Sequence, residues 1–156
     1  MNIGITVTGA KEVEKMLHKL ERKDSAKIAR TETRQAQKDV MLPAVKSNAI
    51  TMVSGMMGSL IAKNLAVRAM TKMKRGSYGA KVIIKPTDAF VSDANGVRSY
   101  IPNAIEYGHA AANDAGGVKV TSPIPFKREA YEAKRRPLAA KLAKEMVKAI
   151  ERAAKI

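Results

Sequence analysis

The sequence of 156 residues contains no cysteine, and its acidic and aromatic residues are few. Without cysteine the chain has no disulfide framework, no thiolate metal site and no cysteine nucleophile. Two Phe and four Tyr supply the aromatic bulk, so the core must be built largely from Ala, Val, Ile, Leu and Met. No window approaches the roughly 20 apolar residues of a membrane span, and the first residues lack the pattern of a secretory signal. We therefore expect a soluble protein that is made in the cytoplasm and meets no membrane.

Length and charge restrict the expected number of domains and the kind of partner. A chain of this length fits one domain, and we expect residues 1–156 to form it. The formal net charge is +15, from 29 Lys and Arg against 14 Asp and Glu. Such an excess predicts attraction to polyanions or to an acidic protein surface, and the alternative is that it serves solubility alone. The charges are dispersed and lack the interleaved aromatic residues of single-strand nucleic-acid binders.

The N-terminal third changes its periodicity from strand to helix. Apolar residues alternate over 3–7, which predicts a short strand, and then follow the helical period over 10–20. A second helix is expected from a cap at Asp24 or Ser25 to about 45–49, with a kink or an end at Pro43. Its narrow inward face consists of Ala29, Thr33, Ala36 and Val40.

The middle of the chain predicts a β-hairpin. Residues 51–60 hold two glycines and three methionines and fit neither period, which indicates a flexible linker. Alternating residues from Leu65 and a β-branched run ending at Lys85 then predict a hairpin with a basic turn. The basic residues of that turn are Lys72, Lys74 and Arg75, which contact phosphates under the alternative that the chain binds nucleic acid. A second turn region with a short strand is expected over 88–96.

A basic helix ends the chain. It is expected from Arg128, with Pro125 suited to its start and Pro137 expected to bend or divide it. Its basic face could meet a membrane, a nucleic acid or an acidic partner, or be a solvated outer face. Together these elements predict an α+β fold, in which a small mixed or antiparallel sheet packs against a long N-terminal helix and the basic C-terminal helix.

Residues that carry catalytic chemistry are sparse. His18 and His109 stand in different elements without companion ligands at metal spacing. No nucleophile motif accompanies His109, and Glu106 is the only acid in a distinctive local sequence. We therefore expect no enzyme activity, no metal and no cofactor.

The stretch from Tyr100 to His109 brings aromatic, acidic and turn-forming residues together. Gly108 can take a positive φ and turn the chain, and Tyr107 is expected to close the core beneath the following loop. Glu106 can accept hydrogen bonds or pair with a basic residue across a subunit interface. An intradomain turn that caps the sheet is an equal alternative. The small residues that follow predict a flexible loop at about 110–122, ordered against a neighbouring subunit.

The order of these segments resembles the tail-completion, or minor tail-component, family of long-tailed bacteriophages over nearly the whole chain. The resemblance rests on four matching pieces, in chain order: Ser54-Gly55 through Ser59-Leu60, Tyr100, Glu106-Tyr107-Gly108, and Pro125-Phe126 followed by Ala130. The chain departs from the family pattern at His109, where Ser or Thr is common, and at the second glycine, Gly58.

The resemblance implies a non-enzymatic virion protein that assembles as a ring at the head-tail junction or the tail end and completes or joins the tail. Its implied partners are further copies of itself, most simply in a hexamer, other phage neck and tail proteins, and packaged DNA through non-specific contact. Implied locations are the virion and, during assembly, the host cytoplasm. The expected interface residues are Tyr100, Glu106, Tyr107, Gly108, His109, Phe126, Arg135 and Arg136. The alternative is a basic nucleic-acid-binding protein that contacts phosphates through its C-terminal helix and the 72–75 turn.

Overall fold

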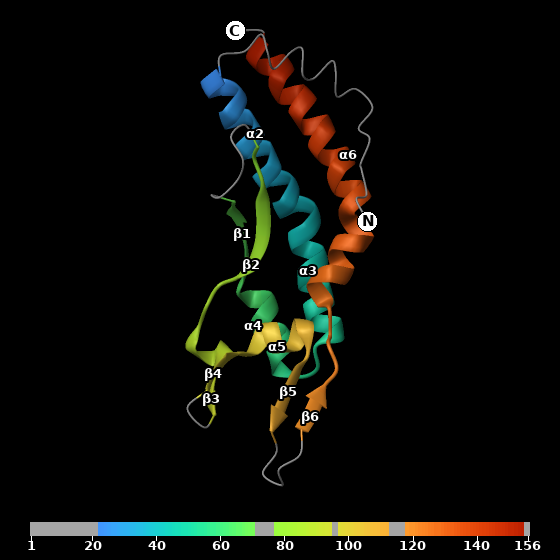
Figure 1. Ribbon diagram of the computed structural model, residues 1–156. Helices are drawn as coiled ribbons and strands as arrows, with labels where there is room; N and C mark the ends of the chain where they lie inside the picture. Colours follow the sequence, from blue (N-terminus) through green and yellow to red (C-terminus); the bar gives the residue numbers. More distant parts are fainter. Residues whose placement is uncertain (1–21, 71–76, 95–96, 113–117, 155–156) are drawn as a thin grey trace. The chain divides into compact units, whose positions relative to one another are not determined.

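The structure is a computed structural model that describes residues 22–70, 77–94, 97–112 and 118–154. The fold is α+β, as the sequence predicts, and helical residues outnumber strand residues in the described part of the chain (Figure 1). The strand and helix predicted for the first 20 residues lie outside the described residues. So do the residues of the basic turn, which are Lys72, Lys74 and Arg75.

The chain groups into two compact units. Among the described residues, unit 1 consists of 22–40, 67–70, 77–81 and 135–154, and unit 2 of 41–66, 82–94, 97–112 and 118–134. Neither unit is one continuous stretch, since two helical segments and one β-hairpin continue from one unit into the other. One cooperative domain therefore stays a prediction.

A continuous helical run occupies the first described residues. It consists of α2 (Arg22–Ala36), a π-helical turn η1 (Gln37–Met41) and α3 (Leu42–Met52). Asp24 and Ser25 lie inside α2, so the predicted cap at these residues is wrong. The irregular turn comes just before Pro43, which has no amide proton and whose ring would clash with the carbonyl one regular turn earlier.

Small side chains form the buried part of unit 1. Ala29 and Ala36 of α2 are buried, as the sequence predicts for the inward face of this helix. The second part of α6 (Phe126–Ala154) lies beside α2 and buries Ala149 and Ile150 (Figure 1). The helix is continuous through Pro137, so the predicted division there is wrong.

A second helix replaces the linker that the sequence predicts after α3. The chain turns at Gly55, whose φ of +71° favours glycine, and α4 (Met56–Lys63) follows directly. Gly58 lies against the end of α3, where an added Cβ would overlap the carbonyl oxygens of Ala49 and Val53. The two glycines therefore serve a tight helical turn and a close helix contact.

Three separate two-stranded sheets complete the described residues, instead of the single sheet that the sequence predicts. The predicted hairpin is confirmed as β1 (Leu65–Ala69) paired with β2 (Ala80–Ile84). The predicted short strand is confirmed as β3 (Val91–Ala94), which follows the 3-10 turn η2 (Asp88–Phe90).

The other two strand pairs are antiparallel. In the first, β3 pairs with β4 (Val97–Tyr100), and Val91 lies opposite Tyr100. In the second, β5 (His109–Ala112) pairs with β6 (Val118–Thr121). This second hairpin corrects the prediction of a flexible loop at about 110–122, because most of that stretch has strand partners.

Unit 2 has a core of larger side chains than unit 1. Phe90 and Phe126 are fully buried, and so are Met41, Ile61 and Val45. These residues come from η1, α3, α4, η2 and the start of α6, which are far apart in the sequence. The unit is therefore held together by apolar contacts between distant segments.

Candidate functional site

The stretch from Tyr100 to His109 contains a short helix, α5 (Ile101–Tyr107), and the turn that the sequence predicts follows it at Gly108. Tyr100 precedes the helix in an extended conformation, and Pro102 stands in its first turn, where its missing amide proton costs nothing. Pro102 is buried. The helix thus starts with proline and stops at glycine, as short helices often do.

Gly108 ends α5 with a φ of +72° and a ψ of 167°, a region open to glycine and strained for other residues. An added Cβ would lie 2.6 Å from the carbonyl oxygen of Thr121 and 3.1 Å from the nitrogen of Pro123. Glycine is therefore required for two reasons, the backbone conformation and the close approach of the chain after β6.

Glu106 is the central residue of the site, and 3% of its surface is exposed. Its Oε2 accepts a hydrogen bond of 3.0 Å from the amide of Lys127, and its Oε1 accepts one of 3.1 Å from the amide of Arg128. These are amides of the first turn of α6, which have no partner within the helix. Glu106 therefore caps α6 from a different helix, and its negative charge lies at the positive end of the helix dipole.

The start of α6 explains why this cap is needed. The carbonyl of Pro125 accepts the amide of Glu129, which makes Pro125 the residue in the capping position. Proline has no side-chain acceptor, unlike the Ser, Thr, Asp or Asn residues that usually cap a helix. The Glu106 carboxylate fills that role, and Asn48 Nδ2 donates to the Phe126 carbonyl at 3.2 Å. We call α5, Gly108 and residues 121–130 the α5–α6 junction.

Tyr107 and Phe126 belong to this junction, and Tyr100 directly precedes it. Phe90 and Tyr100 meet edge to face, with ring centroids 6.1 Å apart at an angle of 80°. Burial raises the pKa of the half-buried Tyr100 phenol above its ordinary value. The Lys127 ammonium lies 5.9 Å from the centre of the Tyr107 ring and 5.8 Å from that of Phe126, within cation–π range.

The structure brings most of the expected interface residues into unit 2. Glu106 and Phe126 are buried, whereas Tyr107 and His109 are exposed. The hydrogen bonds of Glu106 lie within its own chain, but they cap the start of α6 and not the sheet that the intradomain alternative names, while an interface role stays a prediction. Tyr107 has 73% of its surface exposed, which corrects the expectation that it closes the core.

The remaining predicted residues lie elsewhere. Arg135 and Arg136 are exposed on the part of α6 that belongs to unit 1.

Sequence reasoning missed Asn48 and Phe90 as parts of the site. Asn48 is a polar residue next to the buried Ala49 on the inward side of α3, and an amide on an apolar helix face is a usable signal. Phe90 is one of two phenylalanines in an aromatic-poor chain, which marks it as a core residue, yet no local pattern pairs it with Tyr100.

The junction holds backbone amides and one carboxylate that are already bonded to each other. In the described part of the chain, no group of three or more His, Asp or Glu residues could hold a metal ion. Among the same residues, no helix is both long and apolar enough to cross a membrane. Comparison with known proteins gives no match, whether to a family model, to a curated protein or to a solved structure. Function must therefore be inferred from the geometry and the sequence pattern.

Proposed function

We propose that the chain is a non-enzymatic structural protein of a bacteriophage virion, which forms a ring at the head-tail junction or the tail end and completes or joins the tail. The ring contains six copies where it meets a tail tube, because identical head-to-tail contacts close when the rotation between copies permits. Other neck and tail proteins of the particle are its further partners.

The observation that carries this proposal is the convergence of the resembling pieces in one unit. Glu106 hydrogen-bonds the start of the helix that Phe126 opens, and Gly108 lies against the strand end that leads to that helix. Phe126 and Ala130 are both buried beside it. These residues match the family pattern at separate places in the sequence, yet they contact one another in the fold. Their contact supports a common origin with the family over a chance match of short motifs.

Exposed apolar side chains in unit 2 support assembly. Met56 has 90% of its surface exposed and Ile50 has 57%, in addition to the exposed Tyr107. Large exposed apolar side chains are common at sites where a partner covers them. A ring supplies such a partner on each side of every copy.

Native mass measurement and particle imaging of the full chain test the proposal. We expect closed rings whose population grows with protein concentration. In the double variant Met56→Ser/Tyr107→Ser, the concentration at which half of the chains are in rings should rise about tenfold or more. Met70→Ser is the matched control, since Met70 is an exposed methionine of unit 1, and it should assemble as the unaltered chain does. The melting temperature of the monomer should stay the same in both variants.

Two results would overturn the proposal. One is a chain that remains monomeric at high concentration and shows no ring within a phage particle. The other is equal loss of assembly in Met70→Ser and in the double variant, which would separate assembly from the exposed apolar residues of unit 2.

A further inference from the structure

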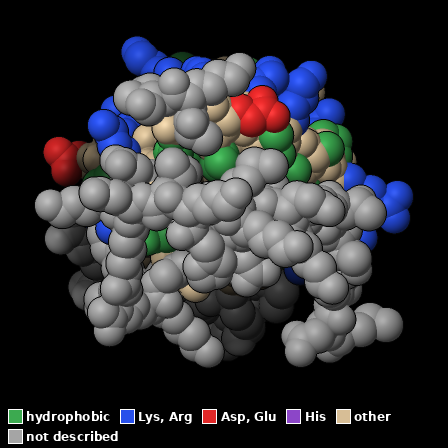
Figure 2. All heavy atoms as spheres, turned by 90° about the horizontal axis from the view of Figure 1, so that it is seen from above, with side chains coloured by type: hydrophobic (Ala, Val, Ile, Leu, Met, Phe, Trp, Pro, Cys, Tyr) green, Lys and Arg blue, Asp and Glu red, His purple; other side chains and the backbone are tan. Residues whose placement is uncertain are grey.

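Positive charge is concentrated in unit 1. Its described side chains include twelve Lys and Arg against four Asp and Glu, an excess of eight, whereas those of unit 2 include six against five, an excess of one. In unit 1 the described side chains belong to residues 25–40, 67–70, 77–81 and 135–153. Those of unit 2 belong to residues 41–66, 82–93, 99–109 and 121–134. Figure 2 shows Lys and Arg side chains at several places around the edge of one face, with fewer Asp and Glu among them.

Six of the eleven exposed cations in the described part of unit 1 form two helical stripes. On α2 they are Lys27, Arg30 and Arg34, spaced three and four residues apart, so they share one face of the helix. On α6, Lys144, Lys148 and Arg152 are spaced four residues apart, or about 6 Å per step along the helix axis. Each stripe therefore presents three exposed positive charges in a row.

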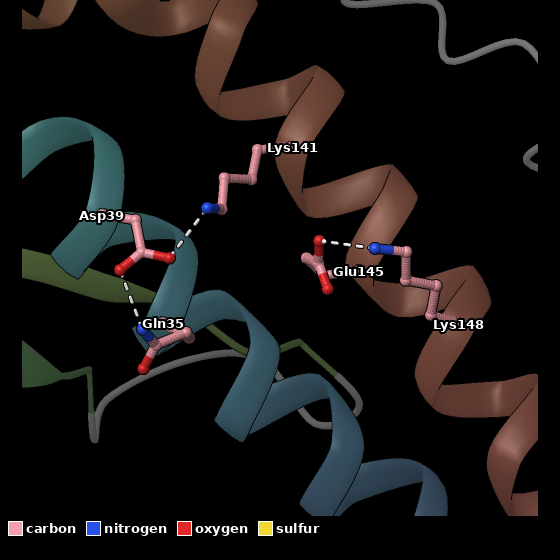
Figure 3. Close-up of polar contacts among 5 residues, drawn as sticks. All are labelled: Gln35, Asp39, Lys141, Glu145 and Lys148. Atoms are coloured by element: carbon pink, nitrogen blue, oxygen red, sulfur yellow. Dashed lines mark hydrogen bonds and ion pairs between the residues drawn. The ribbon is translucent and has the colours of Figure 1, made fainter.

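The four described acids of unit 1 are Glu32, Asp39, Glu145 and Glu151, and two of them form ion pairs. Asp39 pairs with Lys141 at 2.8 Å, but Lys141 belongs to neither stripe (Figure 3). Glu145 pairs with Lys148 at 3.3 Å, and the Lys148 side chain is 51% exposed. An exposed pair of this kind is weak and yields readily to a competing anion. Arg30 lies 5.3 Å from the centre of the Tyr78 ring, a contact that leaves its charge in place.

We infer that the two stripes, Lys27/Arg30/Arg34 on α2 and Lys144/Lys148/Arg152 on α6, bind the phosphate backbone of duplex DNA without sequence preference. The inference goes beyond the proposed ring and does not depend on it. Cations in rows with few acids between them complement a regular line of phosphates.

The composition of unit 1 favours duplex DNA over other polyanions. Tyr78 is the one aromatic residue among its described side chains, and Arg30 lies over its ring, so single strands have no platform for base stacking. Met70 is the one large exposed apolar side chain of the described part of unit 1. A membrane-surface helix needs an exposed apolar face, and a protein interface needs an apolar centre, and the stripes offer neither.

Binding of the full chain to a fluorescent duplex of random sequence tests this inference, with salt varied between about 50 and 200 mM. If the six cations each contact a phosphate, the plot of log K against log salt has a slope of about −5. A second random duplex should bind equally well, and a single strand of the same length should bind more weakly.

A matched pair of triple variants locates the surface. Lys144→Gln/Lys148→Gln/Arg152→Gln removes the α6 stripe, and Lys46→Gln/Lys63→Gln/Lys85→Gln removes three exposed lysines of unit 2. Both lower the net charge by the same amount. The α6 variant should weaken binding about tenfold or more at fixed salt and reduce the slope by about 3, whereas the unit 2 variant should change the affinity less than about twofold. Circular dichroism confirms that both variants keep their helix content.

Three results would overturn the inference. The first is that the unaltered chain binds no duplex across this salt range. The second is that the two variants lose affinity equally, in which case net charge and not the stripes governs binding. Tighter binding to polyglutamate than to duplex, at equal charge concentration, would assign the stripes to an acidic protein. Ring formation is tested separately by native mass measurement, and its outcome does not depend on these DNA-binding results.

Discussion

The two units of the chain bury different kinds of side chain. Unit 2 buries Phe90, Phe126 and Met41, whereas the buried residues of unit 1 are mainly alanines, with Ile150 as its largest fully buried side chain. Large side chains gain more free energy on burial, while small ones let helix backbones approach closely. Stability is therefore expected to depend on large apolar residues in unit 2 and on the absence of bulk in unit 1.

The two units also differ in charge. Unit 2 is close to neutral among its described side chains and uses one buried acid, Glu106, to fix a helix end. Unit 1 carries most of the positive excess on exposed helix faces. Unit 2, which buries the larger side chains, thus contains the α5–α6 junction. Unit 1, which buries mainly alanines, carries the exposed positive charge.

The largest expected effect is on the core of unit 2. Phe126→Ala should lower the free energy of unfolding by about 3 to 5 kcal/mol, because it removes a fully buried ring and leaves a cavity. Ile150→Ala in unit 1 should cost about 2 kcal/mol, near the lower end for such truncations, since smaller neighbours can close around it. Chemical denaturation of both variants measures the difference. A larger loss for Ile150→Ala would contradict the contrast between the two cores.

The buried cap of α6 gives the next effect. Glu106→Ala should lower the free energy of unfolding by about 2 kcal/mol, because two amides of the first turn lose a charged acceptor. Glu129→Ala is the matched control, since Glu129 is an exposed acid in the same first turn, and it should cost less than about 0.5 kcal/mol. Thermal melting of both variants decides the role of Glu106. If Glu106→Ala melts normally yet fails to assemble, its main role is at an interface.

Local periodicity explains which parts of the fold the sequence predicts. The helices predicted around 24–49 and 128–155 and the hairpin predicted over 65–85 each repeat apolar residues at a regular spacing, and each is present in the part of the chain that the structure describes. The α4 helix and the β5–β6 hairpin were missed, because glycines in one and small residues in the other favour irregular structure. The helix also persists through Pro137, which is exposed, so water can satisfy the carbonyl that loses its amide partner.

The site was predicted less completely than the fold. The sequence marks Glu106 and Gly108 as unusual, yet the groups that Glu106 binds are backbone amides 21 and 22 residues away. Backbone amides carry no sequence signal, and their position depends on how α5 and α6 pack. A tertiary helix cap is therefore visible only in three dimensions, although a proline in the capping position of a helix hints that another residue must supply the acceptor.

Overpacking tests the small-residue core of unit 1. Ala36→Leu should lower the free energy of unfolding by about 1 to 2 kcal/mol, because Ala36 is 1% exposed and the added atoms must displace their neighbours. Thr31→Leu, at an exposed position of the same helix, controls for helix propensity and should have little effect. Urea denaturation compares the two. Should Ala36→Leu stabilise the chain, unit 1 contains unfilled space and the contrast between the cores weakens.

The smallest effect is expected at the exposed ion pair of unit 1. The Lys141 ammonium holds the pKa of Asp39 below its ordinary value, and Asp39 in turn raises the pKa of Lys141 (Figure 3). The pair therefore contributes stability above the ordinary pKa of Asp, 3.8, and loses it as the pH falls through the lower folded value. At the alkaline end the contribution is full below 10.5 and is lost as the pH rises through the raised pKa of Lys141. Because both side chains are partly exposed, Asp39→Asn should change the melting temperature at neutral pH very little, and added salt should remove the difference. A large drop in the melting temperature would show that this pair, and not the packing of small residues, holds the N-terminal helical run and α6 together at η1.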